Sequence, residues 1–365
     1  MEAMVGGRLP SPGFWRGRRV FLTGHTGFKG GWLSLWLSAM GADVQGFALP
    51  PPTEPSLFRE ARLDTVVAHT VGDIRDGAAL AAAIHRFGPD IIIHMAAQPL
   101  VLQSYQQPVE TYATNVMGTV HLLEAARSGT TAQVTLIITS DKCYDNRDSL
   151  WGYREPDPMG GHDPYSNSKA CAELVTAAYA GSFFAALGRA LASVRAGNVI
   201  GGGDWARDRL MTDLIGSLIE NRAPVLRSPA SVRPWQHVLE PLSGYLLAIE
   251  HLAARPVAGA AWNFGPDPAG EVTVGEVADR VCALWGGGIR PVIEDNAGRG
   301  KEARLLTLDS TKARRELGWR PRWGLERTLA ETVRWYRAWQ AGTEMRQFTL
   351  EQIAAYSAAA PAEAR

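Results

Sequence analysis

The sequence predicts an α/β fold in which a doubly wound parallel sheet carries a smaller, mixed lobe towards the C-terminus. Short runs of continuously apolar residues alternate with stretches of helical periodicity through the first half of the 365-residue chain. Continuous apolarity is typical of strands that are buried on both faces of a parallel sheet. After three glycines at residues 201–203, the chain becomes richer in Arg, Pro and Trp and its predicted elements become shorter, which indicates the second lobe.

The elements of the sheet follow one another as repeated strand and helix units. Strands are predicted at residues 20–23, 44–49, 91–95, 134–139 and 191–195, and helices at residues 32–40, 78–87, 113–127 and 166–186. Each helix returns the chain to the next parallel strand, which is the arrangement of a doubly wound sheet. Two later segments, 258–264 and 294–308, are expected to return towards the sheet, so the boundary between the lobes is predicted to be discontinuous.

The charge and cysteine content exclude several classes of function. The 37 Lys and Arg residues balance the 37 Asp and Glu residues and form no basic block, so we expect neither nucleic acid nor a membrane as a partner. Residues 1–15 are rich in Gly and Pro and fit neither a signal peptide nor a membrane span. The three cysteines are too few and too scattered for a disulfide framework or a metal cluster. We therefore predict a cytoplasmic protein that binds no metal.

A glycine motif at the junction of the first strand and the first helix predicts a dinucleotide site. Gly24, Gly27 and Gly30 follow the apolar run and open the helical pattern. A pyrophosphate can approach the backbone there and bind the free N–H groups at the helix N-terminus, so the spacing favours NAD as cofactor. Glycines at this spacing also occur in ordinary tight turns. The cofactor residues predicted in this run are Gly24, Thr26, Gly27, Phe28, Lys29 and Gly30.

The residues that would hold the adenosine half of the cofactor are less clear. Asp73 and Ile74 follow another short apolar run, and an acid with backbone groups there could bind adenine, although Asp73 also suits a turn or a helix N-cap. The acid that usually ends the second strand and holds the ribose is missing, because residues 47–49 lead into three prolines and Asp43 lies at the opposite end. The choice between NAD and NADP therefore stays open at this position.

Tyr165 and Lys169 predict the chemistry. They lie four residues apart in a helical pattern, so both side chains share one face, where the ammonium group can lower the pKa of the phenol. A phenolate can take a proton from a substrate hydroxyl while hydride leaves the adjacent carbon. A solvated helix pair is the alternative. Ser140, at the end of a predicted buried strand, favours the catalytic interpretation, because such ends face the ligand crevice and its hydroxyl could bind the same oxygen.

Long segments of the chain resemble the extended short-chain dehydrogenase/reductase family of NAD-dependent epimerases and dehydratases. The segments are GHTGFKGGWLSLWL from Gly24, HMAAQPLV from His94, SDKCYDN from Ser140, WGYREPDPMGGHDPYSNSK from Trp151, RAGNVIGGGDWARDRL from Arg195 and RPWQHVLEPLSGY from Arg233. Within the family, they are most similar to the branch that dehydrates CDP-glucose. The resemblance implies a Rossmann-type fold, bound NAD, and Ala96, Ala97 and Asn115 as further cofactor residues.

The resemblance also implies a reaction and roles. Such enzymes oxidise C4 of the glucose unit of CDP-glucose, eliminate water across C5 and C6 and return hydride to C6, in deoxysugar biosynthesis for lipopolysaccharide. Tyr165 would be the base at the C4 hydroxyl, and Lys169 would hold the nicotinamide ribose. Ser140 would polarise the C4 oxygen, and Asp141 would protonate the departing C6 hydroxyl.

One residue departs from the pattern of related dehydratases. Enzymes that act on other nucleotide sugars carry Glu as the C5 base where this chain has Lys142. Lys142 could serve as the base if burial and the charge of Lys169 lower its pKa, although a Lys at a strand end is more often a surface or ion-pairing group.

Substrate contacts are predicted mainly in the second lobe. Guanidinium groups bind phosphate with two hydrogen bonds, which favours arginines as partners of the diphosphate. Arg233 is the strongest candidate, with packing on Trp235 as the alternative interpretation. The predicted substrate residues are Gln98, Asn198, Arg207, Arg209 and Arg233.

The predicted organisation has four parts: a flexible arm at residues 1–15, an NAD-binding Rossmann domain at 16–200, a mainly substrate-binding lobe at 201–356, and a loose tail at 357–365. As in the family, helices 113–127 and 166–186 are expected to pack into an intermolecular bundle, giving a homodimer or a dimer of dimers. Another nucleotide-sugar dehydratase or a 4-epimerase would share Tyr165 and Lys169. A non-catalytic dinucleotide sensor is the remaining alternative, and the retained catalytic residues argue against it.

Overall fold

The structure is a computed structural model that describes residues 7–267, 271–294 and 306–362. At its centre lies a sheet of seven strands: β1 (Arg19–Thr23), β2 (Asp43–Ala48), β3 (Ala68–Val71), β4 (Ile91–His94), β5 (Val134–Ile138), β6 (Ala190–Ala196) and β11 (Ala258–Phe264). The order is β11-β6-β5-β4-β1-β2-β3, and every neighbouring pair is parallel. The chain changes direction across the sheet between β1 and β4, where α/β folds bind ligands at the carboxyl ends of their strands. The predicted α/β fold is confirmed.

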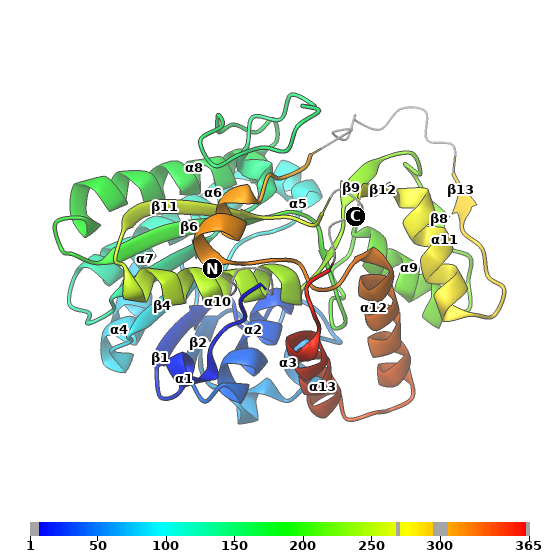
Figure 1. Cartoon of the computed structure of the whole chain (residues 1–365), viewed down its shortest axis with the longest axis horizontal. Helices are drawn as coiled ribbons and strands as arrows, with labels where there is room; N and C mark the ends of the chain where they lie inside the picture. The colour runs from blue at the N-terminus through cyan, green and yellow to red at the C-terminus, as the bar shows by residue number, and fades with distance from the viewer. Residues whose placement is uncertain (1–6, 268–270, 295–305, 363–365) are drawn as a thin grey trace.

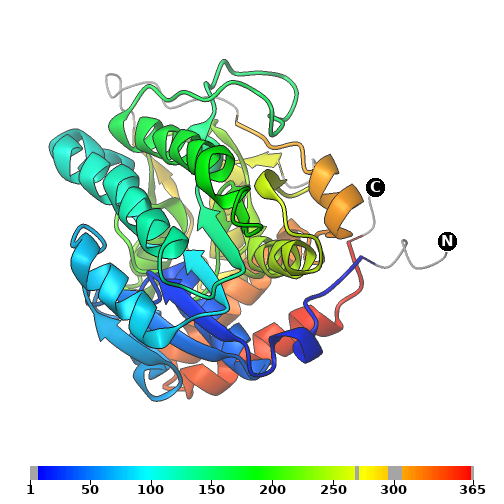
Figure 2. The ribbon, with the colours of Figure 1, turned by 90° about the vertical axis from the view of Figure 1, so that its left-hand side faces the viewer.

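Helices cover both faces of the sheet (Figures 1 and 2). One face carries α4 (Gly77–Phe87), α7 (Gly118–Arg127) and α8 (Pro164–Tyr179), and the other carries α2 (Phe28–Ala39) and α10 (Leu239–Ala254). Alternate residues of β1 enter the two cores: Phe21 packs on the side of α4 and α7, whereas Val20 and Leu22 pack on the side of α2 and α10. Because all three are fully buried, the strand shows the continuous apolar run from which it was predicted.

The second lobe is a mixed structure, drawn at the right of Figure 1. Its helices are α9 (Leu210–Ile219), α11 (Val274–Trp285) and α12 (Leu325–Gln340). Its short strands form pairs: β7 (Val199–Ile200) with β10 (Gln236–His237), β8 (Val225–Leu226) with β13 (Val292–Ile293), and β9 (Val232–Pro234) with β12 (Glu271–Thr273). Only the last of these pairs is antiparallel. The remaining α-helices described are the short helices α1 (Pro12–Trp15), α3 (Leu57–Glu60), α5 (Val101–Gln106) and α6 (Pro108–Tyr112) and the longer helix α13 (Met345–Ala358).

Several sequence expectations differ from the structure. The strand β3 was not predicted, because it lies at the sheet edge, where its residues are largely exposed and form no continuous apolar run. The predicted helices 113–127 and 166–186 each contain a π-helical segment, at Ala113–Met117 and Ala180–Phe184. The segment 258–264 does return to the sheet, as β11. Of the segment 294–308, residues 295–305 lie outside the described residues.

The chain ends are also packed more closely than expected. Within the predicted arm, Trp15 is fully buried and its indole nitrogen donates to Glu250 Oε1 at 2.9 Å. Within the predicted substrate lobe, α10 lies on the sheet and α13 packs against α2, with the rings of Trp36 and Tyr356 5.7 Å apart. Much of the C-terminal sequence therefore covers the sheet. None of the helices described is long and apolar enough to cross a membrane.

A buried carboxyl group ties α10 to the C-terminal segment. Oε1 of Glu240 accepts hydrogen bonds from the backbone of Arg322 at 3.0 Å and Trp323 at 2.7 Å, and Oε2 accepts one from the hydroxyl of Tyr356 at 2.7 Å. Only 1% of Glu240 is exposed, and burial raises its pKa from 4.5 to about 7. The folded protein therefore binds a proton here more tightly than the unfolded chain does.

This raised pKa makes stability depend on pH. The contribution of Glu240 to stability is complete below pH 4.5 and declines as the pH rises through about 7, by about 3 kcal/mol if this group acts alone. Glu240→Gln keeps the shape and one carbonyl oxygen but has no proton to lose. We therefore expect the melting temperature of the variant, relative to the wild type, to increase between about pH 5 and pH 8. A difference that is the same at every pH would contradict this account.

Candidate active site

The glycine motif forms a turn between β1 and α2 that has no room for a side chain at Gly24 or Gly30. Gly24 has a φ of +78°, and a Cβ atom there would lie 2.7 Å from the backbone nitrogen of Ala96. A Cβ atom on Gly30 would lie 2.2 Å from the carbonyl oxygen of Gly24. Gly27 is the N-cap of α2, and no side chain caps the helix. The first turn of α2 therefore keeps free N–H groups, which suit the pyrophosphate of a dinucleotide.

The loop after β4 is fixed beside this turn. The hydroxyl of Thr23 accepts hydrogen bonds from the backbone of Met95 and Ala96, both at 3.1 Å. Asn115 is buried; its Oδ1 accepts from the backbone of Gln98 at 2.8 Å, and its Nδ2 donates to the hydroxyl of Ser168 at 2.9 Å. The predicted residues Ala96 and Ala97 thus lie in a loop beside the glycine turn, while Asn115 joins that loop to α8.

Gln98 does not fit its predicted contact with the sugar. Its Nε2 donates to Thr111 Oγ1 at 2.9 Å, and its Oε1 accepts from the backbone of Leu100 at 2.5 Å. Both ends of the amide are therefore used inside the fold. The sequence shows a polar residue in a loop near the site, but it does not show that the partners of this residue belong to the protein.

The residues that were expected to hold adenosine make several contacts within the protein itself. Asp73 accepts from the backbone of Arg75 at 2.9 Å and pairs with its guanidinium group at 2.6 Å, and the pKa of Asp73 is lowered chiefly by that side-chain hydrogen bond. The N-cap of α4 is Asp76. Ile74 is buried against Gly118. The hydroxyl of Thr26 donates to the carbonyl of Leu49 at 2.9 Å, which ties the glycine turn to the end of β2.

The predicted catalytic residues come together at the ends of β5 and α8. The hydroxyl of Ser140 lies near the phenol of Tyr165 and lowers its pKa. That hydroxyl donates to Asp141 Oδ1 at 2.8 Å and accepts from the backbone of Lys142 at 3.2 Å. Tyr165, Ser140 and Asp141 are buried, and Lys142 is half-buried. The Nζ of Lys169 donates to the carbonyl of Ile138, at the end of β5, at 3.4 Å.

Burial dominates the electrostatics of this cluster. It raises the pKa of Asp141, against the charges of Lys142 and Arg233. It also raises the pKa of Tyr165 to about 12; the hydrogen bond with Ser140 opposes this rise and the charge of Asp141 adds to it. The expected lowering of the phenol pKa by Lys169 is therefore not found. Burial lowers the pKa of Lys169 itself to about 8, and nearby Glu173 opposes that change.

Lys29 and Tyr245 extend the cluster on the side of α2 and α10. The Nζ of Lys29 donates to the hydroxyl of Tyr245 at 2.9 Å and lies 5.1 Å from the centre of its ring. Burial, followed by the charges of Lys169 and Arg209, lowers the pKa of Lys29 to about 7. Tyr245 was not predicted as a site residue. The signal for it was its place in the segment that begins at Arg233 and carries the family resemblance.

Two of the predicted substrate arginines lie near the cluster. The charge of Arg233 lowers the pKa of Asp141, and that of Arg209 lowers the pKa of Tyr165. Arg209 also pairs with Asp204 at 2.8 Å. Arg207 is exposed in the same loop. Asn198 is half-buried after β6, where its carbonyl accepts from the backbone of Gln236 at 3.1 Å.

Comparison with known proteins identifies the family of this chain. The sequence model of the GDP-mannose 4,6-dehydratase family matches residues 21–332. The chain belongs to this family. It is 52% identical to the CDP-glucose 4,6-dehydratase of Salmonella typhimurium over 352 residues, which cover 95% of this chain and 98% of that protein. The family resemblance inferred from the sequence is confirmed.

Solved structures of dehydratases share the fold. A double mutant of DesIV, the dTDP-glucose 4,6-dehydratase of Streptomyces venezuelae, solved with NAD bound, superposes with a TM-score of 0.75 and 27% identity, covering 90% of this chain and 99% of that one. The UDP-glucose 4-epimerase of Thermotoga maritima superposes with a TM-score of 0.76 at 21% identity, covering 87% and 98% of the two chains, which shows the shared fold.

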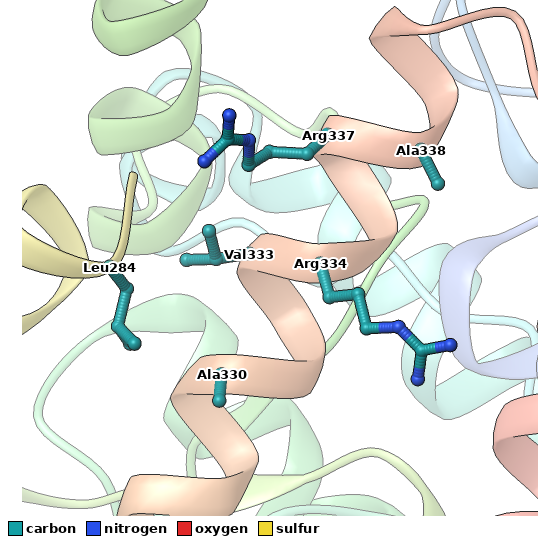
Figure 3. Close-up of a pocket in the computed structure, with 6 residues that line it drawn as sticks. All are labelled: Leu284, Ala330, Val333, Arg334, Arg337 and Ala338. Atoms are coloured by element: carbon teal, nitrogen blue, oxygen red, sulfur yellow. The ribbon is translucent and has the colours of Figure 1, made fainter. Parts of the chain in front are cut away.

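A separate hollow lies in the second lobe of this dehydratase-family chain. It has a volume of about 400 Å³ and lies between α11 and α12 (Figure 3). Its lining residues are Leu284, Ala330, Val333, Arg334, Arg337 and Ala338. No predicted site residue lines it, and Arg337 donates to the carbonyl of Trp285 at 3.0 Å. In the described part of the chain, no group of three or more His, Cys, Asp or Glu side chains is placed to hold a metal ion.

Proposed function

We propose that this chain is a CDP-glucose 4,6-dehydratase, which converts CDP-D-glucose into CDP-4-dehydro-6-deoxy-D-glucose and water. The cluster of Tyr165, Ser140 and Asp141 carries the proposal, because it gathers a base, a hydroxyl and a buried acid at the ligand-binding edge of the sheet, with the hydroxyl donating to the acid. The identity to the Salmonella typhimurium enzyme supports CDP-glucose as the substrate.

The glycine turn fits NAD as the cofactor. NAD, when bound, supplies a hydride acceptor for C4 of the sugar and then a hydride donor for C6. The free N–H groups of α2 bind the pyrophosphate, and the absence of side chains at Gly24 and Gly30 gives it access to the backbone. Lys169 holds the nicotinamide ribose from α8. Asp73 and Ile74, which follow β3, would bind the adenine.

The buried hydrogen-bond chain explains how an acid and a base act in one site. Ser140 binds the C4 oxygen, and Tyr165 takes the proton of the C4 hydroxyl. Asp141 donates a proton to the departing C6 hydroxyl, which requires its carboxyl group to be protonated first; burial raises its pKa and favours that state. A neutral Asp141 no longer raises the pKa of Tyr165. The protonation that prepares the acid therefore also favours the phenolate form of Tyr165, which is the form that accepts the C4 proton.

Lys142 is the proposed base at C5. It follows Asp141 directly in the turn after β5, and we propose that the two side chains serve neighbouring carbons of the sugar, with Lys142 acting in its neutral form. We expect Lys142→Met to slow the exchange of the C5 hydrogen with solvent deuterium by about 10²-fold or more, the usual effect of removing a general base. Mass spectrometry of the product measures this exchange. Normal exchange would assign the base to another residue.

The diphosphate is proposed to lie between the cluster and the second lobe. Arg233 and Arg209 act on the charges of the catalytic residues and are therefore close enough to hold the diphosphate next to the sugar. Arg207, in the same loop as Arg209, and Asn198, after β6, are the further proposed contacts. Gln98 is left out because the fold uses its amide.

Incubation of the purified protein and NAD with CDP-glucose tests the function, with UDP-, dTDP- and GDP-linked hexoses as parallel substrates. Loss of one water, measured by mass, and the 4-keto-6-deoxy product are expected from CDP-glucose alone. Product from another nucleotide sugar would keep the mechanism and change the substrate. Silence with all of them, despite bound NAD, would favour a 4-epimerase or a non-catalytic sensor.

A homodimer, or a dimer of such dimers, is proposed as the working form. Large apolar side chains are exposed on the helices α5 to α8: Leu102, Tyr105, Val109, Met117 and Leu174. A second copy of this face would bury them, because monomers rarely expose so many apolar groups together. We further propose a cytoplasmic setting and a role in making deoxysugars for lipopolysaccharide.

A further inference from the structure

A buried ion pair lies directly behind the catalytic residues. Glu173 is one helical turn beyond Lys169 on α8, and its Oε2 accepts from the guanidinium group of Arg195, on β6, at 2.8 Å. Oε1 accepts from the Nε of the same arginine at 3.0 Å, and the hydroxyl of Ser193 donates to Oε2 at 2.6 Å. Both charged side chains are only 4% exposed. A buried pair that is hydrogen-bonded on every side suits a role in holding other groups.

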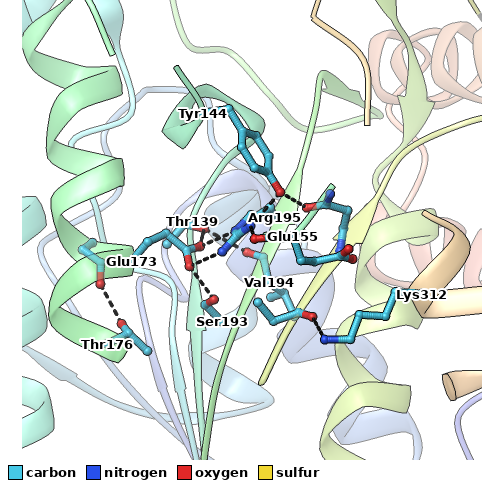
Figure 4. A network of polar contacts seen from close by, with 12 residues as sticks. Thr139, Tyr144, Glu155, Glu173, Thr176, Ser193, Val194, Arg195 and Lys312 are labelled. Atoms are coloured by element: carbon cyan, nitrogen blue, oxygen red, sulfur yellow. Dashed lines mark hydrogen bonds and ion pairs between the residues drawn. The ribbon is translucent and has the colours of Figure 1, made fainter. Parts of the chain in front are cut away.

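The pair is attached to both ends of the turn that carries Ser140, Asp141 and Lys142 (Figure 4). Before the turn, the hydroxyl of Thr139 donates to Glu173 Oε1. After the turn, Arg195 donates to the hydroxyl of Tyr144 at 2.6 Å. The turn is therefore held through the residues on either side of it by two partners that bind each other.

The far end of the turn is anchored to a third strand. The hydroxyl of Tyr144 donates to Asn263 Oδ1, on β11, at 2.8 Å. Arg195 also donates to the carbonyl of Glu155 at 3.0 Å, and the carboxylate of Glu155 accepts from the backbone of Asn263 at 2.9 Å. Tyr144 is 1% exposed and Asn263 is fully buried, so water does not compete for these bonds.

Glu173 also acts on the charge of Lys169. Four groups that titrate or carry charge face this lysine from different elements: Glu173 on α8, Cys143 after β5, Lys29 on α2 and His94 on β4. Of these, Glu173 is the carboxylate, and its charge opposes the effect of burial on the Lys169 pKa. Without it, the ammonium group would lie in a buried site beside another lysine.

We propose that Glu173 and Arg195 are positioning residues for the dehydration: they fix the turn that presents the acid and the C5 base, and Glu173 keeps Lys169 protonated. The inference rests on the proposed function. Neither residue touches the substrate in this account. The two roles are separable. The turn is held through the hydroxyl of Tyr144, whereas the effect on Lys169 depends only on the charge of Glu173.

The electrostatic role is tested by the pH profile of Glu173→Gln, which keeps the shape and removes the charge. Lys169 must stay charged, so activity is lost as the pH rises through its pKa, about 8. Removal of the Glu173 charge lowers the pKa of Lys169. The alkaline limb of the kcat/KM profile should therefore move to lower pH by about one unit or more. At alkaline pH, this shift makes kcat/KM of the variant about tenfold lower than that of the wild type. An unmoved limb in a folded variant would overturn this role.

Two further variants separate a specific effect from a loss of fold. Because Glu173→Gln leaves Arg195 unpaired and buried, the double variant Glu173→Gln, Arg195→Met removes both charges and should show the same displaced limb. Glu240→Gln is the matched control, since it removes another buried carboxylate in contact with α13 rather than with the turn. Its alkaline limb should not move; an equal displacement would mark a general effect of removing a buried carboxyl group.

The positional role is tested by Tyr144→Phe, which removes one hydroxyl and leaves the ion pair intact. We expect kcat for product formation to fall about tenfold, with the alkaline limb where it is in the wild type and KM little changed. Wild-type kcat would refute the positional role. Failure of the proposed function is a different result, because the wild-type protein would then form no dehydrated product from any nucleotide sugar.

Discussion

Replacement of Tyr165 with phenylalanine is expected to abolish turnover while the protein still binds NAD. The phenolic oxygen is the group that takes the proton from the C4 hydroxyl, and no later step begins until C4 is oxidised. General bases contribute about 10²- to 10⁴-fold to a rate, so kcat should fall by at least that factor. Phenylalanine keeps the buried aromatic ring and fills the same space, so the fold is expected to be preserved.

Two measurements check this result. The rate of product formation is followed by mass spectrometry, and the NAD retained per chain is measured after denaturation. Tyr179→Phe is a control on the same helix, because that hydroxyl donates to Glu124 Oε1 at 2.6 Å, away from the cluster. We expect the control to keep the wild-type rate. A Tyr165→Phe enzyme that turns over normally would remove Tyr165 from the mechanism.

The raised pKa of Tyr165 could not have been predicted from the spacing between Tyr165 and Lys169 in the sequence. Four residues on a helix place the two side chains on one face, and the sequence shows that much. The pKa of Tyr165 depends mainly on how deeply its phenol is buried. Part of the protein near it is Tyr245 of α10, which lies far away in the sequence. Burial therefore outweighs the pairing that the sequence suggests.

The elements of the sheet were predictable where the core covers both faces. The strands β1 and β5 are continuously apolar because they are buried on both faces, whereas β3 lies at the edge and shows no such signal. Gln98 shows the same limit for polar groups. Its residue type fits a sugar contact, but only the structure shows that Thr111 and Leu100 already bind its amide.

The role of Glu173 was missed for a related reason. The spacing of Glu173 from Lys169 is visible in the sequence. Its proposed role depends on Arg195, which lies on β6, and on Thr139, which lies at the end of β5. A carboxylate on an amphipathic helix is usually a solvated group. The parallel pairing of β5 with β6 and the packing of α8 against β6 bring the three residues together behind the turn.

Asp141→Asn should separate the two halves of the reaction. The amide keeps an oxygen that accepts from Ser140, so the geometry at C4 is preserved, but it cannot protonate the C6 hydroxyl. We expect loss of water to slow by about 10²- to 10⁴-fold, while hydride still leaves C4 and the absorbance of reduced nicotinamide rises and persists. The charge of Asp141 raises the pKa of Tyr165, so its removal should also allow C4 oxidation at lower pH than in the wild type.

The control for this variant is an aspartate outside the cluster. Asp145 lies on the same loop and pairs with Arg147 at 2.7 Å, and Asp145→Asn should change neither step substantially. An unchanged rate of water loss in Asp141→Asn would remove this residue as the acid. A loss of C4 oxidation together with dehydration would show instead that the Ser140 hydroxyl depends on the carboxylate for its orientation, since both steps use that hydrogen bond. The acid and the base would then act as one unit rather than in sequence.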